Sequence, residues 1–301
     1  MRFAPLLSAA ACLRPALRRS AGTLCTASKI GYVTDVEGSL DFWRRFCDLS
    51  EVVISDQAGD LNTLALRDGC HLVFGGDAVD KGNGDLRFLR SILGLKQRNP
   101  DRVHLVLGNR DINKMRLLAE LADAHWLAAD AHPGVYWRPS PEGGPAAFLA
   151  KQPEGALRED SRANRLRYML ADNMGSPRAW EHRRSELTEL APETAREAAV
   201  QGGMVHTAAV SDDEVMSSYL DSLAPGGLLR EYLKNSQLAA CLDDVLFVHG
   251  GVTEASLGHV PPTRAGGPAR WVDDPREWVR ELNAFAAAQV DEWCADAEAV
   301  E

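Results

Sequence analysis

The chain has 301 residues, of which 45% are apolar and 25% charged, an ordinary composition for a globular protein of one large or two small domains. Its formal net charge of −10 argues against non-specific binding to nucleic acid, which requires a basic surface. A phosphorylated substrate is not excluded, because bound metal ions supply positive charge locally. No apolar run approaches the roughly 18 residues of a transmembrane helix, so we expect no membrane span.

The first 34 residues differ from the rest because they carry five basic residues and no acidic one. This composition is typical of an organelle transit peptide. We therefore expect residues 1–28 to direct the protein to a mitochondrion or plastid; without such import the protein would be cytoplasmic. A secretory signal, with Phe3 to Leu13 as its apolar part, and an arm without any address are the alternatives. The arginines that directly follow the apolar run weaken the secretory interpretation.

Residues 29–140 alternate between strand-like and helix-like segments, which predicts the first part of an α/β layered core. The expected strands are Ile30–Thr34, Val52–Ser55, Thr63–Leu66, His71–Gly75 and Val103–Leu107. The expected helices are Leu40–Leu49, Asp85–Leu95 and Ile112–Ala124.

Residues 141–243 are mostly helical in pattern, and we interpret them as a helical insertion in the core, with a separate helical domain as the alternative. The expected helices are Arg162–Asp172, Pro177–Leu190, Asp212–Leu223 and Leu228–Cys241. Residues 244–301 would then form the second part of the core, with one strand at Val245–Val248 and no strand-like run after Val252. A long amphipathic helix is expected from Asp274-Pro275 onward.

Four segments place a polar residue beside or near glycine directly after a strand-like run. They are Thr34-Asp35-Val36-Glu37-Gly38, Gly75-Gly76-Asp77-Ala78-Val79-Asp80-Lys81-Gly82, Gly108-Asn109-Arg110-Asp111 and Val248-His249-Gly250-Gly251. A buried strand that ends in a carboxylate, amide or imidazole delivers that group to the edge of a sheet. We therefore expect these four ends to meet. Two divalent ions bound there would acidify a water and hold a phosphate, so the pattern predicts a two-metal phosphoester hydrolase.

The order Asp, Asp, Asn, His in these segments resembles that of the calcineurin-like metallophosphoesterases, across most of the chain. Gly-Asp-Ala-Val-Asp-Lys-Gly and Val-His-Gly-Gly-Val are similar to segments of the phosphoprotein phosphatase and diadenosine tetraphosphatase-like branch. The resemblance implies an α/β fold in which two packed sheets form a sandwich flanked by helices, here with a helical insertion.

The metal ligands are expected to divide between two ions. Asp77, beside glycine at the end of a strand, is the carboxylate best placed to bridge the ions. Asp35 and Glu37 would complete the first site, because residues two apart in an extended chain point to the same side. The resemblance implies that Asn109 and His249 join Asp77 at the second ion. Glu37 replaces a histidine of the family pattern, and this oxygen ligand favours Mn²⁺ or Mg²⁺, with Fe and Zn as alternatives.

The proton donor of the family is altered in this chain. The resemblance implies that Asp80 works with a histidine at the position that Arg110 occupies here. Arginine stays protonated and cannot act as a general acid near neutral pH, but it can bind a phosphoryl oxygen in a bidentate manner. The alternative is an ion pair of Arg110 with Asp80 or Asp111 that only holds the loop. Lys81 stands where the family has a phosphate-binding arginine and would contribute a point charge.

We therefore predict a metal-dependent phosphoester hydrolase whose substrate is a phosphorylated small molecule, a nucleotide or a phosphoprotein. The alternative, a catalytically weak metal- or phosphate-binding interaction protein, is favoured by the departures at Glu37 and Arg110. The family's C-terminal histidine motif is missing, since Gly258-His259-Val260-Pro261 follows His249 with no intervening strand and is interpreted as a chance match. We accordingly expect the sequence to be a C-terminally truncated version of a longer phosphoesterase.

Overall fold

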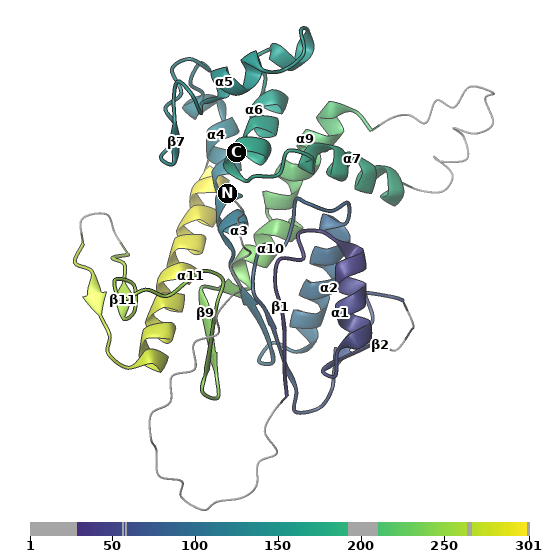
Figure 1. The fold of residues 1–301 in the computed structure, drawn as a ribbon, viewed down its shortest axis with the longest axis vertical. Coiled ribbons are helices and arrows are strands. Elements are labelled where there is room, and N and C mark those ends of the chain that lie inside the picture. The colour runs from purple at the N-terminus through teal and green to yellow at the C-terminus, as the bar shows by residue number, and fades with distance from the viewer. Residues whose placement is uncertain (1–28, 56, 58, 192–209, 264–266, 300–301) are drawn as a thin grey trace, which may run out of the picture.

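The structure is a computed structural model that describes residues 29–55, 57, 59–191, 210–263 and 267–299. It is a mixed α/β structure with a parallel sheet and several small antiparallel pairs of strands (Figure 1). The expected transit peptide at residues 1–28 lies outside the described residues. No helix among the described residues is both long enough and apolar enough to span a membrane.

The centre of the fold is a parallel sheet in the order β1 (Ile30–Val33), β4 (His71–Phe74), β5 (Val103–Val106) and β8 (Ser236–Gln237). Both faces of β4 are covered, which explains why its sequence is a continuous apolar run and not an alternating one. Val33 lies opposite Phe74, which lies opposite Leu105, so the carboxyl ends of the three long strands meet at one edge.

Helices α1 (Leu40–Leu49) and α2 (Asp85–Arg98) cover one face of this sheet (Figure 1). Trp43 and Phe88 contact each other with ring centroids 5.3 Å apart, and Phe74 of the sheet lies 5.2 Å from Phe88. The short antiparallel pair β2 (Val53–Ser55) and β3 (Leu64–Leu66) joins α1 to the sheet. The strands and helices expected up to Val106 are therefore confirmed, with ends shifted by one to three residues.

The opposite face is covered by an antiparallel hairpin of β9 (Ala239–Leu242) and β10 (Val245–Val248). Ala240 of the hairpin packs between Val73 and Val106 of the sheet, and the Tyr32 and Phe247 rings lie 5.6 Å apart. The prediction that helix Leu228–Cys241 continues to residue 241 is wrong, because helix α10 (Leu228–Lys234) ends before two strands. Apolar residues here contact a sheet face, which local helical periodicity does not reveal.

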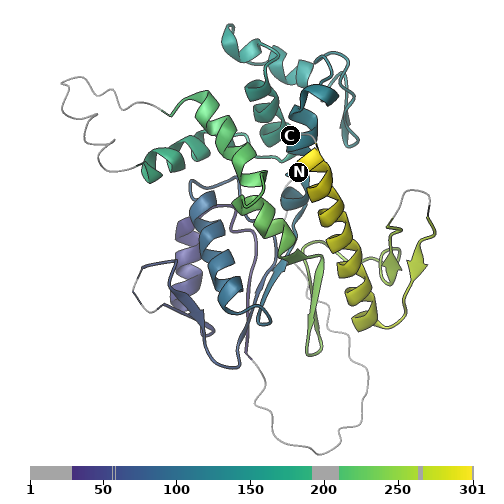
Figure 2. The same cartoon turned by 180° about the vertical axis from the view of Figure 1, so that it is seen from behind.

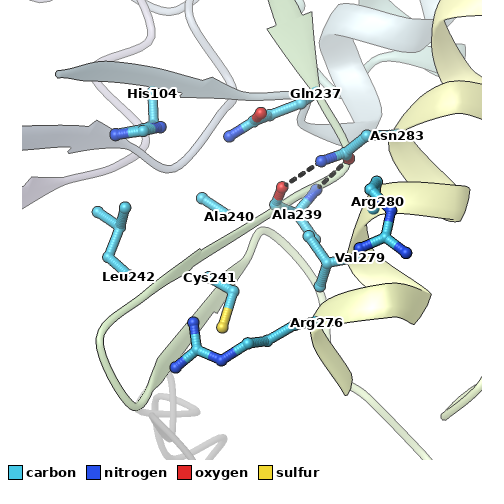
Figure 3. A pocket seen from close by; sticks show the side chains of 10 residues that line it. All are labelled: His104, Gln237, Ala239, Ala240, Cys241, Leu242, Arg276, Val279, Arg280 and Asn283. Atoms are coloured by element: carbon cyan, nitrogen blue, oxygen red, sulfur yellow. Dashed lines mark hydrogen bonds between the residues drawn. The ribbon is translucent and has the colours of Figure 1, made fainter. Parts of the chain in front are cut away.

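Helix α11 (Pro275–Ala299) packs along the hairpin and also contacts β8 at the edge of the parallel sheet (Figure 2). Asn283 fastens the two elements: its Oδ1 accepts hydrogen bonds from the backbone N–H groups of Leu238 and Ala239, and its Nδ2 donates to the carbonyl of Ala239. A pocket of about 290 Å³ opens beside this clamp, with Arg276 on one side and His104 on the other (Figure 3). It lies away from the strand ends that carry the candidate site.

The amphipathic helix expected near the C-terminus is confirmed, and Trp278, Ala286 and Val290 of its predicted stripe are buried. The prediction of no strand after Val252 is wrong in detail. A short antiparallel pair forms between β11 (His259–Val260) and β12 (Arg270–Trp271). Its two-residue strands carry too little alternation to be recognised from sequence.

The remaining helices form a group beyond the carboxyl edge of the sheet (Figure 1). The helix expected at Ile112–Ala124 is divided into α3 (Asn109–Asn113) and α4 (Arg116–Leu121). The helix expected at Arg162–Asp172 ends in a π-helix, Met169–Asn173. A hairpin of β6 (Gly134–Val135) and β7 (Arg138–Pro139) lies beside them. The helices are α3 (Asn109–Asn113), α4 (Arg116–Leu121), α5 (Pro145–Ala150), α6 (Arg162–Tyr168), the π-helix Met169–Asn173, α7 (Ala179–Leu190) and α9 (Asp212–Leu223).

A pair of stacked histidines on neighbouring strands makes folding stability depend on pH. His71 Nδ1 lies 3.2 Å from His104 Nε2. The pKa of His104 is lowered to about 4, mainly because the ring is buried and to a smaller extent because His71 lies beside it. Below the ordinary histidine pKa of about 6.5, His104 binds a proton in the unfolded chain but not in the folded chain. Stability should therefore fall as the pH drops from about 7 to about 5, by about 1–2 kcal/mol from this group.

Urea unfolding at both pH values measures this effect. His104→Gln should show a smaller loss of stability between the two than the unmodified chain, because glutamine does not titrate. His125→Gln changes an exposed histidine and serves as the control. An unchanged pH dependence in His104→Gln would refute the assignment.

Candidate metal centre

Three of the predicted ligands converge at the carboxyl edge of the sheet. One ligand atom each of Asp35, Asp77 and His249 lies within 4.8 Å of the others. Asp35 follows β1 and Asp77 follows β4, so the parallel register brings them together, whereas His249 arrives from the hairpin on the opposite face. Asp35 is exposed and Asp77 is 4% exposed, so the group opens to solvent on one side only.

The loops after β1 and β4 run side by side through backbone hydrogen bonds. The Asp35 N–H donates to the Gly76 carbonyl at 2.9 Å, and the Glu37 N–H donates to the Asp77 carbonyl at 3.1 Å. Asp35, Glu37, Asp77 and Asp80 all have positive φ, at 52°, 52°, 56° and 96°. Four acidic residues in this unfavourable conformation within two adjacent loops indicate a functional site, where strain of this kind concentrates.

Two glycines allow these loops to approach each other. At Gly76, with φ of +100°, a Cβ would lie 2.5 Å from the Gly108 nitrogen and 2.9 Å from His249 Nδ1. At Gly108 a Cβ would lie 2.2 Å from Asp77 Oδ1. Neither position has room for a side chain, so both glycines are required for the ligands to meet.

The tautomer of His249 leaves one ring nitrogen free for a ligand. Its Nδ1 lies 2.8 Å from the Gly75 carbonyl, which can only accept, so Nδ1 carries the proton. Nε2 therefore presents a lone pair, 3.5 Å from Asp77 Oδ1 and 3.2 Å from the Asn109 amide. If the Asn109 amide nitrogen faces inward, it donates hydrogen bonds to His249 Nε2 and to the Asp77 carboxylate. If the amide oxygen faces inward instead, Asn109, His249 and Asp77 all present lone pairs to a cation.

Asp111 holds the two loops in place, a role that the sequence analysis did not assign. Its buried carboxylate accepts hydrogen bonds from the backbone N–H groups of Asp77 and Ala78, both at 3.0 Å, and of Gly108 at 2.8 Å. The Tyr232 hydroxyl, 3.3 Å away, also reaches it. Burial raises the pKa of Asp111 to about 6, although the backbone donors oppose that rise.

Replacing Asp111 by asparagine should cost about 2–3 kcal/mol of folding stability, because an amide nitrogen would face backbone N–H donors. Metal affinity should fall by about 10- to 100-fold, as for other residues that orient a ligand. Chemical unfolding and Mn²⁺ titration measure the two effects. Asp101→Asn, at an exposed position, is the control, and an Asp111→Asn variant that binds metal normally would contradict this positioning role.

Glu37 does not join the group of Asp35, Asp77 and His249. Its Oε1 accepts a hydrogen bond from Nη1 of Arg110 and lies 2.7 Å from Lys81 Nζ. The first metal site predicted from the sequence is thus left with Asp35 and Asp77. The same contacts bring the two predicted phosphate-binding cations together at the edge of the group.

Asp80 pairs with a lysine that the sequence analysis missed. Its Oδ2 forms an ion pair with Lys114 Nζ, and both side chains are fully buried. Neither of the ion pairs considered for Arg110, with Asp80 or with Asp111, is observed; Arg110 pairs with Glu37 and lies 3.5 Å from Asp77 Oδ2. Lys114 stands in a segment of mixed polar and apolar residues, Asp111–Arg116, which gives no indication of its partner.

One loop of the helical group closes over these charges. The Met174 carbonyl accepts a hydrogen bond from Arg110 Nε at 2.9 Å, and its sulfur lies 3.0 Å from Lys114 Nζ. Met174 follows the π-helix Met169–Asn173, an element often found at functional sites. The helical segment therefore contributes directly to the surroundings of the site.

His259, the histidine of the chance motif, lies in β11 against Trp271 with ring centroids 5.3 Å apart, outside the ligand group. A scan against protein-family models finds no match to the chain, and searches of curated proteins and of solved structures find none either. Function is therefore inferred from the geometry of the site.

Proposed function

We propose that the protein is a metal-dependent phosphoester hydrolase of the calcineurin-like type, with the parallel sheet and the β9–β10 hairpin as the two layers of its sandwich. One observation carries the proposal. Ligand atoms of Asp35, Asp77 and His249, from three separate strands, lie within 4.8 Å of one another beside two cationic side chains. Carboxylate and imidazole ligands with adjacent cations suit a divalent metal and a phosphate.

The donor set fits a divalent ion. Asp35, Asp77, His249 and the Asn109 oxygen would hold it, and a set dominated by oxygen favours Mn²⁺ or Mg²⁺. Bound divalent ions would supply an acidified water and positive charge over the phosphoryl oxygens, and a second ion would need Glu37 or a ligand from solvent. The hydrogen bond from His249 Nδ1 to Gly75 keeps the lone pair of Nε2 directed at the ligand group.

The chain's own cations would bind and orient the phosphate. Arg110 offers a planar pair of N–H donors 3.5 Å from Asp77, and Lys81 offers a point charge beside the same Glu37 carboxylate. Arg110 cannot protonate a leaving group, and Asp80 is committed to Lys114. We therefore expect phosphoesters with good leaving groups, such as activated aryl phosphates, to be hydrolysed faster than alkyl esters.

A second function, a metal- or phosphate-binding protein with little turnover, is favoured by one observation. Glu37, which the first ion requires, is paired with Lys81 and Arg110. A chain that holds a single ion would bind phosphate without the second ion that activates the water.

Metal analysis with hydrolysis of an activated aryl phosphate in Mn²⁺ tests the proposal. The expected result is bound metal and turnover that disappears with a chelator and returns with Mn²⁺. Bound metal without turnover would support the second function. Absence of metal binding would contradict the hydrolase, and absence of both metal and phosphate binding would contradict the second function as well.

A further inference from the structure

The carboxylate of Glu37 occupies the place between the two cations that the proposed function assigns to phosphate. It hydrogen-bonds to Arg110 and lies 2.7 Å from Lys81 Nζ, so it meets both of them. The Glu37 side chain is 18% exposed and that of Arg110 is 12% exposed, so water competes only weakly for this contact, whereas Lys81 is 44% exposed. In this arrangement the cations are already neutralised in part by a group of the chain itself.

The contacts that hold Arg110 and the backbone of Lys81 do not depend on the Glu37 side chain. Arg110 is held by its Nε hydrogen bond to the Met174 carbonyl and by its backbone N–H, which donates to Asp77 Oδ1 at 3.0 Å. The backbone N–H of Lys81 donates to the backbone carbonyl of Glu37 at 2.9 Å. If the Glu37 carboxylate moved away, Arg110 would remain in place with unsatisfied donors, and the half-exposed Lys81 side chain would be free to reach the incoming anion.

We propose that Glu37 is an internal occupant of an oxyanion site formed by Arg110 and Lys81, and that an incoming dianionic oxyanion displaces its carboxylate. A dianion such as hydrogen phosphate can neutralise both cations, whereas Glu37 contributes one charge and Asp77, 3.5 Å from Arg110 Nη1, acts on Arg110 at longer range. A singly charged anion gains little over the resident carboxylate. The inference rests on the proposed function in taking phosphate as the ligand.

Inorganic phosphate is the probe, and titration calorimetry in the presence of a chelator measures its binding without any contribution from metal. Glu37→Gln keeps the size of the side chain but removes its charge, so phosphate affinity should rise about tenfold. Glu51→Gln is the matched control, because Glu51 also pairs with a lysine, Lys29, but lies on the exposed surface between α1 and β2. Both variants change the net charge equally, so only a local effect separates them.

Adding Lys81→Met to Glu37→Gln should abolish the gain in affinity. Glu37→Gln should still unfold cooperatively on heating, which shows that it is folded. If its phosphate affinity is then unchanged or weaker, the carboxylate does not compete with phosphate and the inference is overturned. In the unmodified protein, phosphate should shift the NMR signal of Arg110 Nε–H, and an unshifted signal at saturating phosphate would also overturn it.

Turnover is scored separately. Tighter phosphate binding in Glu37→Gln without turnover in any variant supports the inference and contradicts the proposed hydrolase. Turnover that requires Asp77, with equal phosphate affinity in Glu37→Gln and Glu51→Gln, upholds the hydrolase and overturns the inference.

Discussion

Replacing Asp77 by asparagine is expected to lower the hydrolysis of an aryl phosphate by about a thousandfold, equivalent to about 4 kcal/mol of transition-state stabilisation. Asp77 has a ligand atom within 4.8 Å of those of Asp35 and His249, and its Oδ2 lies 3.5 Å from Arg110 Nη1. Asparagine keeps the acceptor for the Arg110 backbone N–H, which lies 3.0 Å from Asp77 Oδ1, but loses the negative charge that a divalent ion needs.

The folded chain should tolerate this substitution. Burial raises the pKa of Asp77, although the Arg110 backbone N–H and the His249 and Arg110 side chains oppose that rise. The ionised carboxylate is therefore less favourable in the folded chain than in the unfolded one, so its replacement by a neutral amide should not lower the melting temperature without metal.

Asp68→Asn is the matched control. Asp68 is exposed and precedes β4, at the opposite end of the strand from Asp77. Steady-state kinetics with Mn²⁺ and thermal unfolding without metal separate chemistry from folding. Full turnover in Asp77→Asn would contradict the assignment of this residue as a metal ligand.

Replacing Lys114 by methionine is expected to destabilise the protein by about 3–5 kcal/mol, because it leaves the buried carboxylate of Asp80 without its partner. The Asp80 and Lys114 side chains are fully buried, and Asp80 Oδ1 already has no hydrogen-bond partner. The backbone N–H of Asp80 donates to Asp85 at 2.9 Å, so the loss should also disturb the loop that presents Asp77.

Chemical unfolding measures this effect against Lys234→Met. Lys234 forms an ion pair with Glu231 at the surface, 3.5 Å apart. Its replacement by methionine should change the free energy of unfolding by less than about 0.5 kcal/mol. In Asp80→Asn combined with Lys114→Met, much of the lost stability should return, since no buried charge remains. Equal effects of the two lysine substitutions would show that the buried pair contributes nothing.

The elements with strong local patterns could be predicted from the sequence, as β4 and α11 illustrate. A continuous apolar run predicted the buried strand, and an apolar stripe at helical spacing predicted the C-terminal helix. Elements whose form depends on distant neighbours could not. Residues 236–242 continue a helical pattern in sequence but form strands that pack against the parallel sheet.

The position of Glu37 shows why the site was predicted only in part. The expectation that Asp35 and Glu37 point to the same side assumed an extended chain, but both residues have a φ of 52°. The alternation of side chains in a strand does not apply to such a backbone. The partner of Asp80 was missed for a related reason, since Lys114 reaches it only because α3 turns back over the loop after β4.

The sequence by itself determined which residues stand at the ends of the strands, because apolar runs followed by glycine and a polar residue have a local cause. That was sufficient to bring Asp35 and Asp77 together, since parallel strands end at a common edge, whereas His249 reaches them only because the β9–β10 hairpin packs on the sheet. Only the tertiary structure decided the pairing of the charges around them. Long cationic side chains can reach several acids within a few ångströms, and burial, which no local pattern encodes, selects among them.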